Sequence, residues 1–178
     1  MATAEAVVRT PGLRLAGVAG YEGSLAHDAA PDSLQRIRTY LRDLADLHTA
    51  LHELYDGEAV VTAGGSAYFD LVAEALGPLH DPGRTRVVVR AGAYLAHDDG
   101  FYRGVTPSNR AGGPAFRAAL HGWVRVISRP EPGLALADGG KRDLPFDEGL
   151  PVVQAIRRGH GRPPNRRATG PPAWRPPS

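Results

Sequence analysis

The stretch VVTAGGSAYFD, from Val60 to Asp70, combines residue types that could bind an anion. Its β-branched start predicts a strand, and the apolar spacing after the glycines predicts a helix. A turn that joins a strand to a helix presents free backbone N–H groups at the helix N-terminus, where a phosphate binds well. Ser66 adds a hydroxyl group beside Gly64 and Gly65. The alternative is a tight turn in which the glycines only permit an unusual backbone angle.

Two further loops carry polar groups after predicted strands. Gly20-Tyr21-Glu22-Gly23 follows the first strand, and we interpret Tyr21 either as a ligand-facing side chain or as a surface residue of a turn. The loop from Arg90 to Tyr102 follows the third strand. Because the carboxyl ends of parallel strands lie at one edge of a sheet, these loops and the Gly64–Ser66 turn are expected to converge on one face.

The loop from Arg90 to Tyr102 is rich in groups that can hold a proton, among them Tyr94 and Asp98. Packing alone does not explain such a composition. A solvated His-Asp-Asp run at residues 97–99 is nevertheless common, and an isolated histidine such as His97 is more often a surface residue than a ligand. The spacing of these three residues matches no metal site.

A fourth polar segment, DGGKRD at residues 138–143, follows the predicted strand GLALA, and Asp147 comes shortly after it. Taken alone, this segment with Asp138 and Lys141 is best interpreted as a charged hairpin turn. Lys141 is the one lysine among 20 arginines, so chemistry that requires a lysine has a single candidate in this chain.

The elements that position these loops alternate between strand and helix. Strands are predicted at Leu13–Val18, Ala59–Thr62 and Thr85–Val89, each short and nearly all apolar, which is typical of a parallel sheet covered by helices. Asp32 or Ser33 is expected to cap a long helix after the first strand. Its apolar stripe recurs at three- and four-residue steps, at Leu34, Ile37, Leu41, Leu44, Leu47, Leu51 and Leu54. A shorter helix is expected to end near Leu76.

The pattern changes after about residue 104. Trp123–Ser128 and Gly133–Ala137 are predicted strands with no helix between them, and prolines punctuate their turn, which indicates an antiparallel region. Three strand–helix units are too few for a closed parallel barrel, which needs eight. We therefore expect an α/β part at 1–104, an antiparallel part at 105–156, and a Pro/Arg-rich disordered tail at 157–178.

Composition excludes several classes of protein. There is no cysteine, and neither a membrane span nor a signal peptide is predicted, so a cytoplasmic protein is expected. The tail from Arg157 holds six arginines and no acid, and removing those six charges takes the net charge from +2 to −4. The body is thus mildly acidic and lacks a basic stripe with interleaved aromatics. Nucleic-acid and membrane partners are not expected.

Four motifs in this order resemble one family: LAGVAGYEG, VVTAGGSAYFD, RAGAYLAHDDGFY and SRPEPGLALADGGKRDLPFDEGLP. Together they are similar to the D-serine dehydratase-like, or amino acid deaminase, group of fold-type III pyridoxal-phosphate enzymes. This group is related to D-threonine aldolase and alanine racemase. The resemblance covers residues 4–156. It implies the C-terminal part of an alanine-racemase-like (β/α)8 barrel followed by an incomplete antiparallel β-domain.

The resemblance also implies a site. Gly64, Gly65 and Ser66 match the loop that binds the phosphate of pyridoxal 5′-phosphate, and Tyr21 and Tyr94 match strand-end tyrosines near that cofactor. Asp98, Asp138, Lys141 and Asp147 match positions near the mouth of the active site. The family acts on a small amino acid, binds a divalent metal such as zinc, and is expected to be a homodimer.

The chain departs from the family in two respects. The Schiff-base lysine of the family would lie on a barrel strand upstream of Met1, and the family's metal ligands lie beyond the resemblance, so no catalytic or metal-binding residue is assigned here. We therefore expect an internal fragment of a D-serine deaminase or dehydratase that is inactive alone. A D-threonine aldolase-like lyase, a racemase of the same fold and a non-catalytic anion-binding module remain alternatives.

Overall fold

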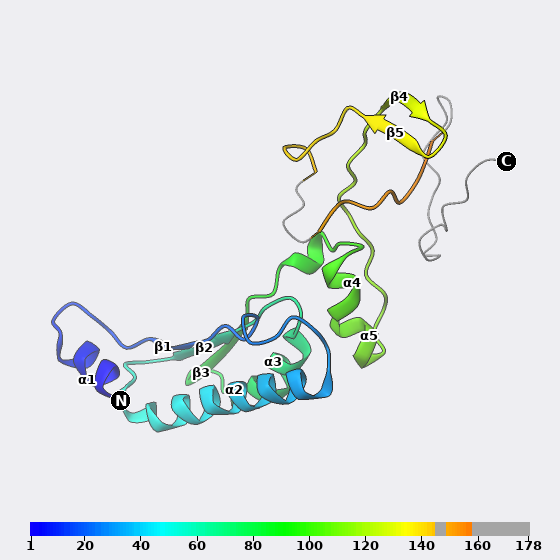
Figure 1. Cartoon of the computed structure of the whole chain (residues 1–178). Helices are drawn as coiled ribbons and strands as arrows, with labels where there is room; N and C mark the ends of the chain where they lie inside the picture. Colours follow the sequence, from blue (N-terminus) through cyan, green and yellow to red (C-terminus); the bar gives the residue numbers. More distant parts are fainter. Residues whose placement is uncertain (145–148, 158–178) are drawn as a thin grey trace. The chain divides into compact units, whose positions relative to one another are not determined.

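The computed structural model describes residues 1–144 and 149–157. The chain divides into two compact units, Met1–Ala119 and Leu120–Ser178. Figure 1 labels the elements along the chain. Asp147 and nearly all of the expected Pro/Arg-rich tail lie outside the described residues. No helix within the described ranges is long and apolar enough to cross a membrane.

A parallel sheet of three strands organises the first unit. Its strands β1 (Gly17–Ala19), β2 (Ala59–Ala63) and β3 (Thr85–Val89) pair in the order β1-β2-β3. The prediction of three parallel strands is confirmed, and the bounds of β3 are as predicted. The first strand is shorter than predicted because the chain from Leu13 to Ala16 forms no ladder, and Leu13 is exposed.

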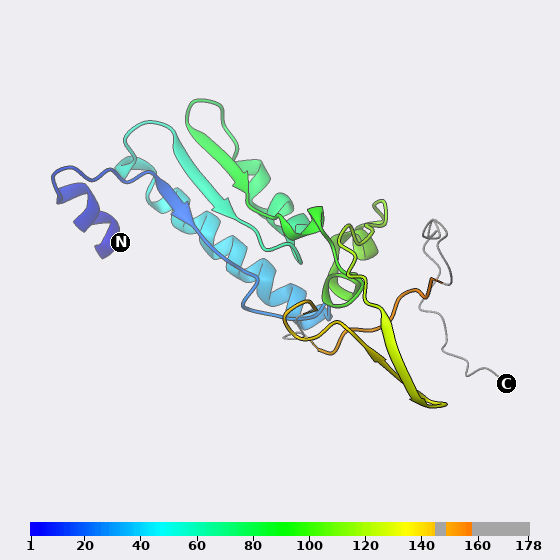
Figure 2. The ribbon, with the colours of Figure 1, turned by 90° about the horizontal axis from the view of Figure 1, so that it is seen from above.

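Helices α2 (Pro31–Ala50) and α3 (Phe69–Leu76) cover one face of this sheet, as Figures 1 and 2 show from two directions. Residues of both helices and of β2 form the core, including Ile37, Leu41, Val61 and Val72. The opposite face is left partly open, because alternate residues of β2 and most of β3 remain accessible. The expectation of a sheet covered by helices therefore holds for one face only.

The start of α2 differs from the sequence prediction. The residue before its first turn is Ala30, which makes no side-chain cap, and Pro31 occupies the first helical position, where its fixed φ suits a helix. Asp28 lies just upstream and accepts a hydrogen bond from the Ala30 N–H at 3.0 Å. Hydrogen bonding from Ser33, and then from Ala30, lowers the pKa of the Asp28 carboxyl.

The buried stripe of α2 also differs from the predicted one near the C-terminal end of the helix. Leu47 is 40% exposed, whereas His48 is buried. Both lie at helical spacing from Leu44 and Leu51, so periodicity alone does not choose between them. The choice depends on Thr85, whose hydroxyl gives the imidazole of His48 a buried hydrogen-bond partner.

Short elements complete the first unit. They are three short α-helices and three 3-10 turns. The helices are α1 (Ala2–Arg9), α4 (Phe101–Val105) and α5 (Pro107–Ala111), and the turns are η1 (His52–Leu54), η2 (Gly77–Leu79) and η3 (Ala93–Leu95). Because α4 and α5 belong to this unit, it continues to Ala119 rather than to residue 104.

The second unit contains an antiparallel hairpin, β4 (Val126–Glu131) paired with β5 (Leu134–Ala137). This confirms the predicted change from parallel strand–helix units to antiparallel strands. β4 begins and ends three residues later than predicted, and Pro130 lies inside it. A proline is tolerated there because each strand of a two-stranded hairpin has an unpaired edge. All residues of both strands are exposed.

Candidate functional site

Three loops meet at the carboxyl edge of the parallel sheet. The guanidinium of Arg90, directly after β3, donates a hydrogen bond to the carbonyl of Gly20, directly after β1. The Gly20 N–H in turn donates to the Thr62 carbonyl at 2.8 Å. The predicted convergence of the three strand-end loops is therefore confirmed.

The Gly64–Gly65 turn already holds an anion, and that anion is the carboxylate of Glu22. Its Oε2 accepts a hydrogen bond from the Gly64 N–H at 3.1 Å, and its Oε1 accepts one from the Gly65 N–H at 2.5 Å. Glu22 is fully buried. Sequence reasoning predicted an anion at these N–H groups but did not single out Glu22. The signal available was one acid within an otherwise small and apolar strand-end loop.

The backbone at Gly64 requires glycine. Its φ of +132° lies in a region that side chains rarely adopt, and a Cβ atom there would lie 2.9 Å from the backbone nitrogen of Arg90. This conformation turns two successive N–H groups toward the Glu22 carboxylate. Both sequence interpretations of the turn thus contain a part of the observed geometry: glycine permits an unusual angle, and the angle creates an anion site.

Ser66 connects the second loop to the third. Its Oγ accepts hydrogen bonds from the N–H of Gly92 at 3.1 Å and of Ala93 at 2.8 Å. Two accepted hydrogen bonds occupy the lone pairs of the oxygen and leave the hydroxyl hydrogen as a donor. The serine predicted to bind phosphate therefore also fixes the start of the loop that carries Tyr94.

Tyr21 lies over the Gly64–Gly65 turn. Its backbone N–H donates to the Tyr40 hydroxyl at 3.0 Å, and 58% of the residue is exposed. A Cβ atom on Gly65 would lie 3.4 Å from Cε2 of Tyr21 and 3.3 Å from Cα of Gly23. The structure thus brings Tyr21, Gly65 and Glu22 together at the turn.

Tyr94 belongs to an aromatic cluster beside the turn. Its ring centroid lies 5.5 Å from that of Phe69, the first residue of α3, and 5.9 Å from that of Phe116. His97 contacts Phe116 edge-on at 5.7 Å and is buried, with φ of +46°. The interpretation of His97 as a surface residue is therefore wrong, because Phe116, from a segment with no predicted structure, covers it.

Asp98 initiates α4. Its Oδ1 accepts hydrogen bonds from the N–H of Gly100 at 2.8 Å and of Tyr102 at 3.0 Å. These are the donors at a helix start that otherwise have no partner. Asp98 therefore has a structural role near the strand-end loops. Within residues 1–144 and 149–157, no group of three or more histidines or acids is arranged to hold a metal ion.

Arg110 of α5 ties the helix after the Gly64–Ser66 turn to the rest of the unit. Its Nε and Nη2 donate to the two carboxylate oxygens of Asp70 at 2.9 and 2.7 Å. The same guanidinium donates to the carbonyls of Ala67 and Val105, each at 2.6 Å, and lies 5.5 Å from the centroid of the Tyr68 ring. Sequence reasoning missed this arginine, because 40 residues separate it from its partner.

Tyr68 is the N-cap residue of α3. It is fully buried, and its hydroxyl donates to the Asp28 carbonyl at 2.9 Å. Burial, followed by the nearby charge of Asp28, raises the pKa of the Tyr68 hydroxyl. The residue therefore stays protonated and acts as a hydrogen-bond donor that joins the start of α3 to the loop before α2.

In the second unit, Asp138 closes the open end of the hairpin. Its Oδ1 accepts the Arg125 N–H at 2.7 Å, and its own N–H donates to the Arg125 carbonyl at 3.0 Å. Lys141 is exposed in the turn that follows. These contacts agree with the charged hairpin turn inferred from the residues. A place for Asp138 and Lys141 at an active-site mouth stays a prediction, and Asp147 lies outside the described residues.

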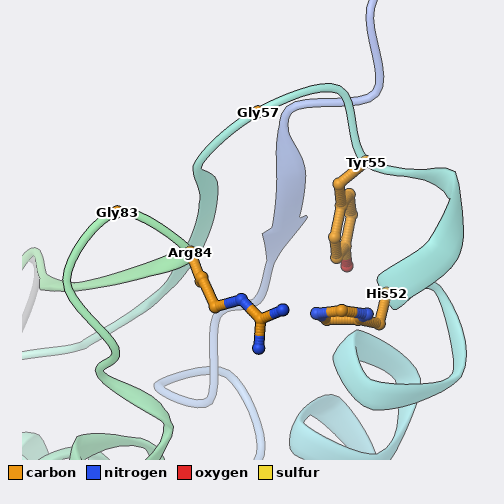
Figure 3. Close-up of a pocket in the computed structure, with 5 residues that line it drawn as sticks. All are labelled: His52, Tyr55, Gly57, Gly83 and Arg84. Atoms are coloured by element: carbon orange, nitrogen blue, oxygen red, sulfur yellow. The ribbon is translucent and has the colours of Figure 1, made fainter.

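A cavity of about 240 Å³ lies at the other end of the first unit, between the turn after α2 and the turn before β3. Figure 3 shows the guanidinium of Arg84 pointing toward the ring of His52, with Tyr55 beside them. Gly57 and Gly83 complete the lining. This cavity faces the amino ends of β2 and β3, whereas ligands of parallel α/β sheets bind at the carboxyl ends. It is therefore separate from the strand-end loops.

Comparisons with known proteins give two matches. The family model described as "Putative serine dehydratase domain" matches residues 119–174. This match continues past Ile156, where the sequence resemblance was expected to end. The crystal structure of D-threonine aldolase from Filomicrobium marinum is similar to this chain, with a TM-score of 0.64 and 28% sequence identity. The match covers 85% of this chain and 37% of the aldolase chain. No curated protein matches.

Proposed function

We propose, from the premise that the chain belongs with the D-serine dehydratase-like enzymes of fold type III, that it forms part of a pyridoxal-phosphate-dependent lyase for D-hydroxyamino acids. One observation carries this proposal. Three strand-end loops converge at the carboxyl edge of a parallel sheet, in a structure similar to D-threonine aldolase over 85% of this chain. The family match over residues 119–174 supports it independently.

We further propose that the sheet is one section of a (β/α)8 barrel. Helices α2 and α3 cover one face (Figure 2), and residues on the other face are partly accessible. In a closed barrel the helices lie outside and the uncovered face lines the interior. Both β1 and β3 are edge strands here, so further strands could pair on either side. The antiparallel hairpin would then belong to the β-domain that follows the barrel.

The cofactor's phosphate does not fit the Gly64–Gly65 turn as the structure has it. Both glycine N–H groups donate to the Glu22 carboxylate, which is a negative group in the predicted place of the phosphate. Ser66 keeps its hydroxyl hydrogen as a donor, while its oxygen accepts from Gly92 and Ala93. We therefore assign no catalytic step to this turn, and the assignment of Gly64, Gly65, Ser66, Tyr21 and Tyr94 to the cofactor remains a proposal.

We propose that the chain alone has no turnover. Pyridoxal-phosphate enzymes use a lysine to hold the cofactor covalently. The one lysine, Lys141, lies in the second unit and follows the hairpin rather than a strand of the parallel sheet. The lysine, the divalent metal site and the homodimer contacts of the family would belong to the parts that complete the aldolase-like structure, of which this chain matches 37%.

An aldol-cleaving lyase is the second candidate, and the similarity to D-threonine aldolase favours it. Both reactions act on a D-amino acid that carries a β-hydroxyl group. They differ in the bond that breaks: the carbon–oxygen bond of the hydroxyl group in dehydration, and the bond between the α- and β-carbons in aldol cleavage. Release of ammonia or of an aldehyde separates the two activities, measured on an enzyme in which this chain is joined to the parts that complete the aldolase-like structure.

The decisive experiment is to mix the purified chain with pyridoxal 5′-phosphate and follow both backbone amide resonances and borohydride-trapped adducts. We expect weak perturbation of the loops that carry Tyr21, Ser66 and Tyr94, without stoichiometric trapping at Lys141. The matched control is Lys141→Arg, which keeps the charge but cannot trap the cofactor. Stoichiometric labelling that this variant abolishes would show that the chain carries its own cofactor lysine. Perturbation confined to other parts of the chain would contradict the proposed site.

A further inference from the structure

The Glu22 carboxylate occupies a built anion site. Two successive backbone N–H groups donate to its two oxygens, and the φ of +132° at Gly64 sets their direction. Hydrogen bonds from N–H groups to an ionised acceptor are among the strong ones, and a concave pair of N–H groups is a recurring way to bind anions. The turn therefore has the chemistry expected from its sequence, but the anion comes from the chain itself.

We infer that Glu22 is a positioning residue that holds the Gly64–Gly65 turn as an internal anion and excludes a phosphate from these two N–H groups. A phosphate-bearing ligand then reaches them only after the carboxylate leaves. Only the identity of that ligand rests on the proposed function. The displacement does not, because any phosphate that binds the turn must displace the same carboxylate.

The surroundings of Glu22 explain why its charge stays in the turn. The residue is fully buried, and none of the ion pairs among the described residues includes it. The nearby guanidinium of Arg90 donates instead to the Gly20 carbonyl. A buried charge without a counter-ion depends on its hydrogen bonds. The Gly64 and Gly65 N–H groups are thus the compensation for this carboxylate, which makes them unavailable to a second anion.

Space and charge both oppose a phosphate beside Glu22. The space beside Gly65 is filled, because an added Cβ atom would lie 3.3 Å from Cα of Gly23 and 3.4 Å from Cε2 of Tyr21. A phosphate oxygen at the same N–H would need the loop from Gly20 to Gly23 to move. Two negative groups at hydrogen-bond separation also repel each other strongly in a buried site.

The test uses inorganic phosphate and backbone amide spectra of the full chain. In the wild type, phosphate is expected to leave the Gly64 and Gly65 resonances in place. In Glu22→Gln, one side-chain oxygen remains as an acceptor, so one N–H is released and the negative charge is lost. Phosphate should then shift the Gly64 and Gly65 resonances, with binding about tenfold tighter than in the wild type.

Glu53→Gln is the matched control. It makes the same chemical change outside the site, because the Glu53 side chain is 96% exposed. It should behave as the wild type does. Shifts of Gly64 and Gly65 in the wild type at the same phosphate concentrations as in Glu22→Gln would overturn the inference, as would unchanged resonances in a folded Glu22→Gln. If Glu22→Gln does not fold, the wild-type titration alone decides.

The same samples separate the two proposals. Pyridoxal 5′-phosphate that perturbs the Tyr21 and Tyr94 loops, with phosphate moving Gly64 equally in all variants, would refute the role of Glu22 and keep the proposed function. If phosphate binds Glu22→Gln at the turn and no strand-end loop responds to the cofactor, the role of Glu22 is supported and the proposed function is refuted.

Discussion

Nε2 of His48 lies 3.2 Å from Oγ1 of Thr85, joining α2 to the first residue of β3 through a buried hydrogen bond. The other ring nitrogen, Nδ1, lies 3.1 Å from the hydroxyl of Tyr55, and the two rings stack with centroids 5.2 Å apart. Both partners are neutral hydroxyl groups, and neither stabilises a charged imidazole as a carboxylate would. The packing thus favours neutral His48.

The free energy of unfolding is predicted to decrease as the pH is lowered, because of His48. Burial, and then the nearby His52, lowers the pKa of His48 in the folded chain. The unfolded chain therefore binds a proton on His48 more readily as the pH falls through about 6.5, the ordinary histidine value. The contribution is complete above this pH and decreases below it. Urea unfolding at several pH values between 5 and 8 measures the effect.

His48→Gln should flatten this dependence, since glutamine keeps a hydrogen-bonding side chain but does not titrate. His121→Gln, at an exposed position of the second unit, should retain it. A wild-type profile that is already flat across this range would contradict the prediction.

Arg110→Lys is predicted to destabilise the first unit by about 2 kcal/mol. The guanidinium makes a bidentate pair with Asp70 and also donates to two backbone carbonyls, whereas an ammonium group cannot reproduce this planar arrangement. The side chains are 17% and 21% exposed, so the effect should be smaller than for a fully buried pair. Denaturant unfolding measures the difference in free energy.

Arg38→Lys serves as the control, because Arg38 and Glu74 are separated by 3.9 Å and are largely exposed. Such a surface pair contributes at most about 1 kcal/mol, and the lysine variant should lie within about 0.5 kcal/mol of the wild type. Equal effects of the two substitutions would show that the bidentate geometry of Arg110 adds nothing.

The elements around the site could be predicted from the sequence because their signals are local. The apolar run TRVVV gives β3 with its observed bounds, and the glycines after each strand indicate the convergent loops. The anion site of the Gly64–Gly65 turn is also predictable from a strand–turn–helix pattern. These features depend on neighbours in sequence, which composition and periodicity report well.

What fills the site could not be predicted, because it depends on contacts between distant residues. The Glu22 carboxylate reaches the N–H of Gly65 across 43 positions of sequence, and Arg110 reaches Asp70 across 40. Spacing carries no information on such pairs. His97 was misjudged for the same reason, since its cover, Phe116, comes from a segment without regular structure.

Glu22→Ala is predicted to destabilise the first unit by about 3 kcal/mol, because it leaves two buried N–H groups without an acceptor and removes two charge-assisted hydrogen bonds. Glu53→Ala, at an exposed position, should stay within about 0.5 kcal/mol of the wild type. Thermal and urea unfolding of the pair test this. Equal stability of the two variants would mean that water satisfies the N–H groups and that Glu22 has no structural role.

Gly64→Ala is predicted to destabilise the chain by at least about 2 kcal/mol and to disturb the strand-end loops. The added Cβ atom would combine a φ of +132° with a separation of 2.9 Å from the Arg90 nitrogen, and neither a rotamer change nor a flexible side chain can relieve a backbone contact. Gly104→Ala is the matched control. Gly104 lies in helix α4, is exposed, and has nothing within 4 Å of its added Cβ atom. That substitution should be neutral or stabilise by about 0.5 kcal/mol through the unfolded state.

Urea unfolding gives both free energies, and amide spectra show whether the shifts of the first variant centre on Gly20–Gly23, Gly64–Ser66 and Arg90–Tyr94. A Gly64→Ala chain as stable as Gly104→Ala would mean that the turn adopts another conformation, and that Glu22 does not hold the two N–H groups together.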